Sequence, residues 1–343
     1  MIFGTRNPFR DSSRIADQPR SYVFPAPALM QNATSLETKG GTSPLPAAWR
    51  GLTFDHLALT TVLMTYGLIV LGGTVRVTDS GTACPDWPLC HGQLLPRIEE
   101  HVLIEYSHRL VASIVGLFIV GMALVAWRRC RGDRLVAVTA ILAIVLLAAQ
   151  VLAGAATVNT ETDADVVALH LSIALTLFAT LIVLALAATR SRLAVVGPLP
   201  ALTIAVALGA FGLVISGAYV SQEGAGLAYP DWPLFDGKLV PAGGYLGDLH
   251  YAHRLLAAGL GALVLLLVFR TWGHERTPMV VLAVALALLI YFLQVLVGAA
   301  NIWFELADSL RILHLALASA LWGVLVFAAV WSYLRPAPLG KAA

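Results

Sequence analysis

Four of the nine histidines in the sequence lie inside long apolar stretches, each near one end of its stretch. They are His108, His170, His253 and His314. An ionisable side chain is costly in an apolar membrane segment, so each such residue is a candidate for function. For a single histidine, a neutral imidazole bonded to a neighbouring carbonyl is an equally good explanation. Four histidines at matched depth favour the functional interpretation.

The four histidines divide into two pairs, one in each half of the chain. Two imidazoles from separate helices are the protein ligands of a bis-histidine heme, because the porphyrin supplies the other four. His108 and His170 would form one pair, and His253 and His314 the other. Zinc would need a third or fourth Cys, His or carboxylate ligand close by. Only the first pair has such a neighbour, Glu105, so the ligand count favours heme.

Glu105 precedes His108 by three positions, so both would face one side of a helix. The corresponding residue in the second half is His250. Only the first half therefore keeps a carboxylate that could move protons, orient water or stabilise positive charge. This difference assigns the chemistry to the first half. An ion pair of Glu105 with Arg109 or Arg76 is the structural alternative, because buried acids are usually paired.

Three arginines are candidates for binding the carboxylates of a heme. Arg109 and Arg254 each follow a candidate ligand directly, and Arg76 ends an apolar stretch. A guanidinium group binds carboxylates bidentately, and the heme propionates are the expected anions. The alternative is an arginine that extends its charged end from the helix terminus into the interface.

Two of the three cysteines, Cys84 and Cys90, lie in a segment expected outside the membrane. The oxidising side of a membrane permits a disulfide there, and both a structural bridge and an exchange-active pair remain open. The corresponding positions of the second half are Tyr229 and Phe235, so that loop has no bridge. Cys130 is expected on the reducing side as a free thiol.

The composition requires a membrane around these residues. The chain has 343 residues, of which 58% are hydrophobic and 12% charged, with a mean hydropathy of +0.80, too little polar surface for a soluble protein. A bilayer core about 30 Å thick needs about 20 apolar residues per helix. The sequence predicts transmembrane helices at eight places, 54–75, 102–127, 135–158, 164–189, 199–221, 247–271, 278–303 and 308–334. The net charge of +2 gives no indication of nucleic-acid binding.

An internal repeat relates the two halves. Pro85-Asp86-Trp87-Pro88-Leu89 recurs 145 residues later as Pro230-Asp231-Trp232-Pro233-Leu234, and the histidine pairs recur at offsets of 145 and 144. Each half has an even number of helices, so both have the same orientation and form a parallel repeat. We therefore predict an all-α membrane protein with eight transmembrane helices, built as two tandem, parallel-repeat four-helix bundles. The two Pro-Asp-Trp-Pro sequences are expected to be structural turns.

The predicted organisation has four parts. Residues 1–50 are polar and are expected to be a flexible cytoplasmic tail, with a transit peptide as the alternative. Residues 51–194 form the first bundle, residues 195–334 the second, and residues 335–343 a cytoplasmic tail. The loops after the second, fourth and sixth helices are rich in arginine. By the positive-inside rule both termini are cytoplasmic, so the histidines lie near the outer side.

With these features together, the sequence resembles the heme A synthase family, in particular the bacterial type with a cysteine pair in the first outer loop. The resemblance covers residues 54 to 334. It is carried by Gly72-Gly73-Thr74-Val75-Arg76, Ser80-Gly81, Cys84-Pro85-Asp86-Trp87-Pro88-Leu89-Cys90, Glu105-Tyr106-Ser107-His108-Arg109, His170, His253-Arg254 and His314.

The resemblance implies an enzyme that oxidises the C8 methyl group of heme O to a formyl group by successive hydroxylations, giving heme A. It implies that His108 and His170 flank the substrate heme, with Glu105 catalytic, and that His253 and His314 ligate a resident heme b that relays electrons. The second outer loop departs from members that have two cysteine pairs.

The implied surroundings are the lipid bilayer of a bacterial cytoplasmic membrane. Heme O would come from a heme O synthase, electrons from a donor such as a quinol, and the product would serve terminal oxidase assembly. A homo-oligomer is compatible with the sequence. Nucleic acid is not an expected partner.

Two other functions fit parts of the pattern. A diheme b-type membrane cytochrome that only transfers electrons would have no need of Glu105. A parallel-repeat heme transporter would favour helix-breaking Gly or Pro pairs at mid-membrane, whereas these helices lack a central proline and their glycines look scattered.

Overall fold

The computed structural model describes residues 53–97, 99–189, 193–195, 201–241, 243–274 and 277–336. These ranges contain eight α-helices: α1 (Phe54–Val77), α2 (Glu100–Arg129), α3 (Arg134–Asn159), α4 (Ala164–Thr189), α5 (Ala201–Gln222), α6 (Tyr245–His274), α7 (Pro278–Trp303) and α8 (Asp308–Tyr333). The predicted tail at residues 1–50 and most of the one at 335–343 lie outside the described residues.

All eight helices are long and apolar enough to cross a membrane, which confirms the predicted all-α, multi-pass membrane fold. Each observed boundary lies within three residues of the prediction; the largest difference is at the end of α6, His274 instead of residue 271. The apolar pattern predicted no strands. The structure adds a short antiparallel pair, β1 (Leu193–Val195) with β2 (Leu334–Pro336).

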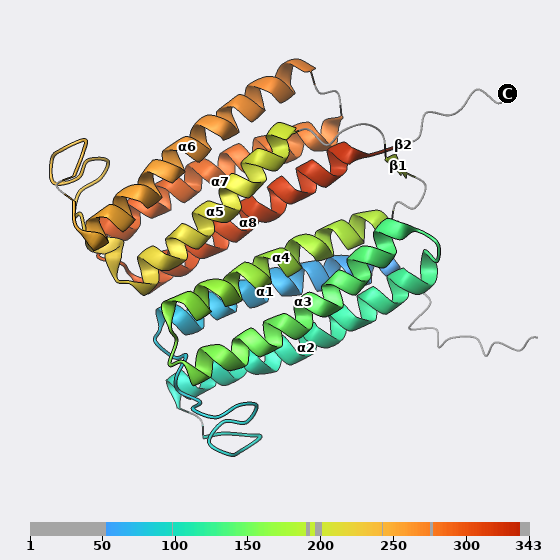
Figure 1. Cartoon of the computed structure of the whole chain (residues 1–343), viewed down its shortest axis with the longest axis horizontal. Coiled ribbons are helices and arrows are strands. Elements are labelled where there is room, and N and C mark those ends of the chain that lie inside the picture. The colour runs from blue at the N-terminus through green and yellow to red at the C-terminus, as the bar shows by residue number, and fades with distance from the viewer. Residues whose placement is uncertain are drawn as a thin grey trace, which may run out of the picture. The chain divides into compact units, whose positions relative to one another are not determined.

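The helices form two groups of four (Figure 1). In the first, α1 contacts α2 and α4, and α3 contacts α2 and α4. In the second, α5 contacts α6 and α8, and α7 contacts α6 and α8. Two four-helix bundles are therefore present, and their relation by a parallel repeat stays a prediction.

Some helix starts follow ordinary capping rules. The Asp133 side chain accepts hydrogen bonds from the backbone N–H groups of Leu135 and Val136 at the start of α3. Pro278 lies in the first turn of α7, where its missing N–H costs no hydrogen bond. These two residues mark where α3 and α7 begin.

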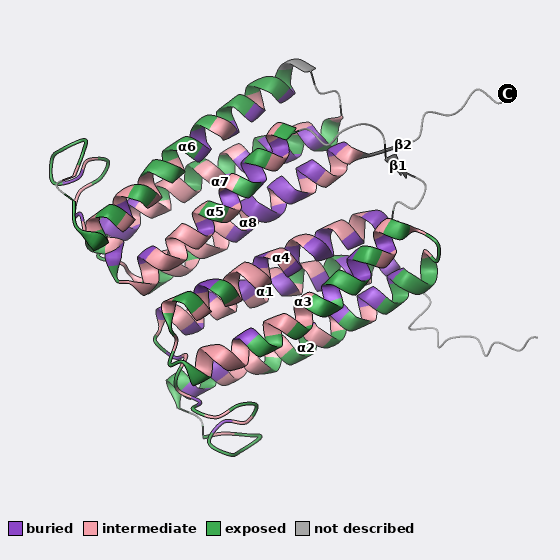
Figure 2. Ribbon diagram, viewed as in Figure 1, coloured by how far each residue is buried: buried purple, intermediate pink, exposed green. Residues whose placement is uncertain are grey.

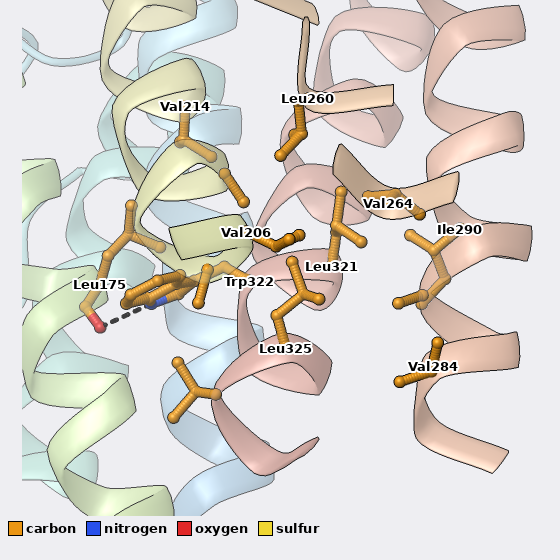
Figure 3. Close-up of a cluster of buried hydrophobic side chains, with 14 of the residues drawn as sticks. Leu175, Val206, Val214, Leu260, Val264, Val284, Ile290, Leu321, Trp322 and Leu325 are labelled. Carbon is orange, nitrogen blue, oxygen red and sulfur yellow. Dashed lines mark hydrogen bonds between the residues drawn. The ribbon is translucent and has the colours of Figure 1, made fainter. Parts of the chain in front are cut away.

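The two bundles meet along α1, α4, α5 and α8. Helices α4 and α8 are the most buried ones, as Figure 2 shows by colour. At their contact the indole Nε1 of Trp322 donates a 3.0 Å hydrogen bond to the carbonyl of Leu175 (Figure 3). Leu321 and Leu325 of α8 pack with Val206 of α5 in the same cluster. The interface is therefore an apolar core that joins both halves.

Several large apolar side chains on the outer helices are exposed, among them Leu117, Ile141, Phe269 and Leu282. Lipid chains, rather than water, are the solvent for such surfaces in a membrane protein. Each of the four candidate histidines instead contacts a glycine on a neighbouring helix of its own bundle.

Candidate functional site

The structure brings the histidines of each half together. His108 lies on α2 and His170 on α4, near enough for a charge on one ring to act on the other. The same holds for His314 on α8 and His253 on α6. All four rings are half-buried. Each predicted ligand pair thus has its two members on different helices of one bundle, as a bis-histidine heme requires.

Each of these histidine rings packs with its Cε1 edge against a glycine of the preceding helix. A Cβ atom added to the glycine would lie about 3 Å from that carbon, for Gly72 and His108 (3.1 Å), Gly154 and His170 (3.1 Å), Gly217 and His253 (3.0 Å), and Gly298 and His314 (3.1 Å). So close a distance is tighter than nearly all real Cβ contacts. The glycine at each position therefore gives the ring the room it occupies.

These glycines are what the sequence interpretation missed when it treated the helix glycines as scattered. Gly72 and Gly217 are 145 residues apart, and Gly154 and Gly298 are 144 apart. Those are the same two offsets that relate the histidines. The repeat therefore contained a signal that would have found the glycines without a structure.

The ring nitrogens differ in their hydrogen bonds. Nδ1 of His253 lies 2.8 Å from the hydroxyl of Ser216. The Gln150 side-chain amide donates to Nε2 of His170 over 3.2 Å, so this side chain must turn away before that nitrogen can bind a metal. In the described part of the chain, Nδ1 of His108, His170 and His314 is buried without a partner. Buried unpaired imidazole nitrogens are consistent with residues that serve a ligand.

Glu105 is buried and holds the loop between α1 and α2, called the first loop, to α2. One carboxylate oxygen accepts a 2.7 Å hydrogen bond from the backbone N–H of Cys84. The other accepts from Arg109, in the ion pair that was the structural alternative for this residue. Cys84 forms a disulfide with Cys90, and both residues are fully buried. That burial shields the bond from thiol exchange in the folded loop.

Arg109 uses most of its hydrogen-bonding capacity within the protein. It donates to the carbonyls of Asp86 and Leu89, each over 2.6 Å, and to that of Cys84 over 2.8 Å, in addition to Glu105. Four of the five N–H groups of a guanidinium are therefore occupied. Propionate binding by this residue stays a prediction, with one donor left for it.

Arg254 holds the loop between α5 and α6, called the second loop, in the same way. It donates to the carbonyls of Asp231 and Leu234, each over 3.0 Å, and to that of Tyr229 over 3.5 Å. Its Nε donates over 3.0 Å to Nε2 of His250, the residue at the position of Glu105. Its propionate role also stays a prediction.

In the second loop two aromatic rings stand where the first loop has its disulfide. The rings of Tyr229 and Phe235 meet edge to face, with centroids 5.2 Å apart. The guanidinium of Arg254 lies 4.8 Å from the Phe235 ring centroid. Aromatic packing thus closes this loop without a covalent bridge, which explains how the two loops share one backbone pattern.

The aspartates of the Pro-Asp-Trp-Pro turns are loop anchors, as expected from the sequence. The Asp86 carboxylate accepts hydrogen bonds from the backbone N–H groups of Gly92 and His91. These bonds hold the pKa of Asp86 below its ordinary value. Asp231 accepts from Gly237 and its neighbour in the same way, and its pKa is lowered for the same reason.

Arg76 is the propionate candidate whose unused donor is buried. Its Nη1 pairs with Asp79 over 3.1 Å, while its Nε is buried without a partner in the described structure. Arg311 on α8 interacts with it electrostatically and donates to the carbonyl of Val77 over 3.3 Å. The sequence interpretation did not identify Arg311 as a candidate, because the corresponding residue of the first half is a valine, Val167.

The comparisons with known proteins decide the family. The profile of the COX15-CtaA family, described as cytochrome oxidase assembly protein, matches residues 55–326. The chain belongs to this family. The matched range contains both Pro-Asp-Trp-Pro loops, Glu105 and all four candidate histidines. The predicted resemblance is thereby confirmed.

Curated relatives match over most of their length. The heme A synthase of Exiguobacterium sp. is 31% identical over 271 residues, which cover 78% of this chain and 89% of that protein. The heme A synthase of Listeria welshimeri is 31% identical over 284 residues, with 78% and 92% covered. That of Lysinibacillus sphaericus is 31% identical over 276 residues, with 76% and 89% covered. The similarity therefore extends over most of the helical part.

Proposed function

We propose that this chain is a heme A synthase, a membrane oxidoreductase that oxidises the C8 methyl group of heme O to a formyl group by successive hydroxylations. The observation that carries the proposal is the match to relatives of that name over about four fifths of the chain. Paired histidines within each four-helix bundle support it, because each pair would supply two imidazole ligands to one heme.

In this proposal the second half, residues 195–334, holds a resident heme b between His253 and His314. The residues fit that group: each ring has a glycine behind it, and Nδ1 of His314 is buried and unpaired. Heme b, when bound, supplies one-electron transfer. The two histidines fix its position, and the apolar helices around them keep water away.

The first half, residues 51–194, would bind the substrate heme O between His108 and His170. Glu105 lies three residues before His108 and has no acidic counterpart in the second half. We assign it the role of holding or moving a proton at the substrate site. Arg76, whose Nε is unpaired, is the residue best able to bind a propionate.

The surroundings follow from the same proposal. The protein would lie in a bacterial cytoplasmic membrane with both termini in the cytoplasm and both heme sites near the outer side. Heme O would arrive from a heme O synthase and electrons from a donor such as a quinol. Heme A would pass to terminal oxidase assembly.

A diheme electron-transfer cytochrome is the second candidate, favoured by the equal glycine and histidine contacts of the two halves. The differences between the halves weigh against it. The first half has Glu105 and a disulfide at the positions where the second half has His250 and an aromatic pair. Two sites with identical roles would not require such differences.

The replacement Glu105→Gln tests the function and the assignment of chemistry to the first half. Glutamine keeps an oxygen that can accept from the backbone of Cys84 but cannot take part in proton transfer. We expect heme A formation to fall by about 10²–10⁴-fold while heme b stays bound. Hemes extracted from cells that also make heme O would be separated chromatographically, and bound heme b measured as its pyridine hemochrome.

The matched control is Glu100→Gln, an exposed acid in the first turn of the same helix. It is expected to leave heme A formation unchanged. Wild-type heme A formation in the Glu105 variant would contradict the assigned role, and absence of heme from the wild-type protein would contradict both redox functions.

A further inference from the structure

His253 differs from the other three candidate ligands in its contact with Ser216. Its hydroxyl lies 2.8 Å from Nδ1 of His253 and donates a 2.8 Å hydrogen bond to the carbonyl of Leu213. Nδ1 of the other three histidines is buried without a partner in the described structure. Among the described residues, only the second bundle therefore provides a hydrogen-bond partner for Nδ1 of a candidate ligand.

This contact determines which nitrogen of His253 carries the proton. A carbonyl oxygen can only accept, so the single hydrogen of the Ser216 hydroxyl is donated to Leu213 when both hydrogen bonds form. Toward the histidine the oxygen must then act as the acceptor, so Nδ1 is protonated. The lone pair remains on Nε2, the nitrogen left to bind iron.

The ring of His253 is held on a second side as well. Gly217, next to Ser216 on α5, packs against the edge of the ring. A Cβ atom added to this glycine would lie only 3.0 Å from Cε1 of His253. One short segment of α5 thus restrains both the position and the tautomer of this histidine. Such outer contacts are the usual means by which proteins orient metal-bound histidines.

The first bundle has the glycine but not the hydroxyl. Gly72 contacts His108 as Gly217 contacts His253. The residue before it is Leu71, which has no hydrogen-bonding group at the position of Ser216. His108 can therefore adopt either tautomer and would bind iron less tightly.

We propose that Ser216 is a positioning residue that makes His253 a permanent heme ligand, and that Leu71 leaves His108 an exchangeable one. The proposal rests on the proposed function, in which one heme is resident and the other must enter and leave. A hydrogen bond from Nδ1–H raises the basicity of the imidazole, which strengthens the bond to iron and favours the ferric state.

The test uses the purified full-length protein and the variant Ser216→Ala. We expect the reduction potential of heme b to become more positive and the affinity for heme b to fall by about 10-fold or more. Redox titration measures the first, and transfer of heme to added apomyoglobin the second. Ser216→Thr, which keeps a hydroxyl, should restore both values toward those of the wild type.

Ser113→Ala is the matched control, because that hydroxyl donates only to the carbonyl of Arg109 within its own helix. An unchanged potential and unchanged heme loss in Ser216→Ala would overturn the role of Ser216. A Thr variant as impaired as the Ala variant would overturn it too, since a hydroxyl would then not be what matters.

Leu71→Ser tests the other half of the proposal. With heme O reconstituted into the protein, loss of that heme to apomyoglobin should become slower, and an unchanged rate would overturn the role of Leu71. A wild-type protein without heme b would refute the proposed function together with this inference. Heme b bound normally, with no effect of Ser216→Ala, would refute the inference alone.

Discussion

At the residue scale, each of the four candidate ligands occupies space that a neighbouring glycine leaves open. The glycines lie on the helix before each histidine, so every ligand depends on a contact between two helices. The structural requirement is steric rather than conformational, because these glycines are helical.

Gly217→Ala should therefore weaken heme b binding. The new methyl group would lie 3.0 Å from Cε1 of His253, so the ring would have to shift by a few tenths of an ångström. Metal sites tolerate such shifts poorly, since ligand geometry sets the strength of the bond. We expect the heme b content of the purified protein, measured as pyridine hemochrome, to fall by about 10-fold, the lower end of the effect of outer-contact mutations at metal sites.

Gly212→Ala on the same helix is the control, because an added Cβ there meets nothing within 4 Å. Equal heme b content in the two variants would show that the contact with His253 does not matter.

The histidines, Glu105 and the cysteines could be named from the sequence, but the partners of the arginines could not. Arg109 was expected to bind a propionate, and four of its five donors are used within the protein, on Glu105 and the loop carbonyls. Sequence spacing tells which residues share a helix face. It does not tell which loop carbonyl folds back onto a guanidinium.

At the element scale, the loop between α1 and α2 and the loop between α5 and α6 have the same hydrogen bonds but are closed by different contacts. An arginine on the following helix holds three loop carbonyls in each, and an aspartate holds two backbone N–H groups. A disulfide closes the first loop and an aromatic pair the second. The two loops therefore make the same hydrogen bonds, one with a disulfide and the other without.

The Asp86 anchor makes the first loop sensitive to acid. Its pKa is lowered by the N–H groups of Gly92 and His91, so the anchor contributes stability above the ordinary pKa of an aspartate, about 3.9. That contribution is lost as the pH falls through the lowered pKa. Asp86→Asn should therefore lower the thermal stability at pH 7, and the difference from wild type should shrink toward pH 3.

Thermal unfolding of both proteins across that pH range measures the effect. A difference that stayed constant down to pH 3 would show that the carboxylate charge does not hold the loop.

At the scale of the whole molecule, the two bundles are joined by close packing of α4 and α8 (Figure 3). The contact includes Trp322 with the carbonyl of Leu175, and Gly323 with the ring of Phe178. A hydroxyl of Tyr66 on α1 also donates to the carbonyl of Ala316 on α8 over 3.2 Å. If electrons pass from one heme to the other as proposed, this interface fixes the distance between the two sites.

Gly323→Ala should destabilise the joined molecule. The added Cβ would lie 2.7 Å from a ring carbon of Phe178, closer than atoms can approach, so one helix must move. Overpacking of this kind typically costs about 1–3 kcal/mol. The temperature at which the half-buried thiol of Cys130 becomes accessible to a maleimide should fall.

Gly121→Ala on α2, where an added Cβ meets nothing within 4 Å, should leave that temperature unchanged. Equal temperatures for the two variants would mean that the packing at Gly323 does not limit stability.

The sequence by itself determined the eight helices and the paired histidines. Bilayer thickness sets the length of each apolar stretch, and the offsets of 145 and 144 expose the duplicated residues. Only the tertiary structure decided which hydrogen-bond donors and acceptors are occupied. Arg109 bonds to carbonyls of its loop, Gln150 to His170, and Ser216 to His253. These contacts join different elements, and their distances depend on how the helices and loops pack, which spacing along the chain does not specify.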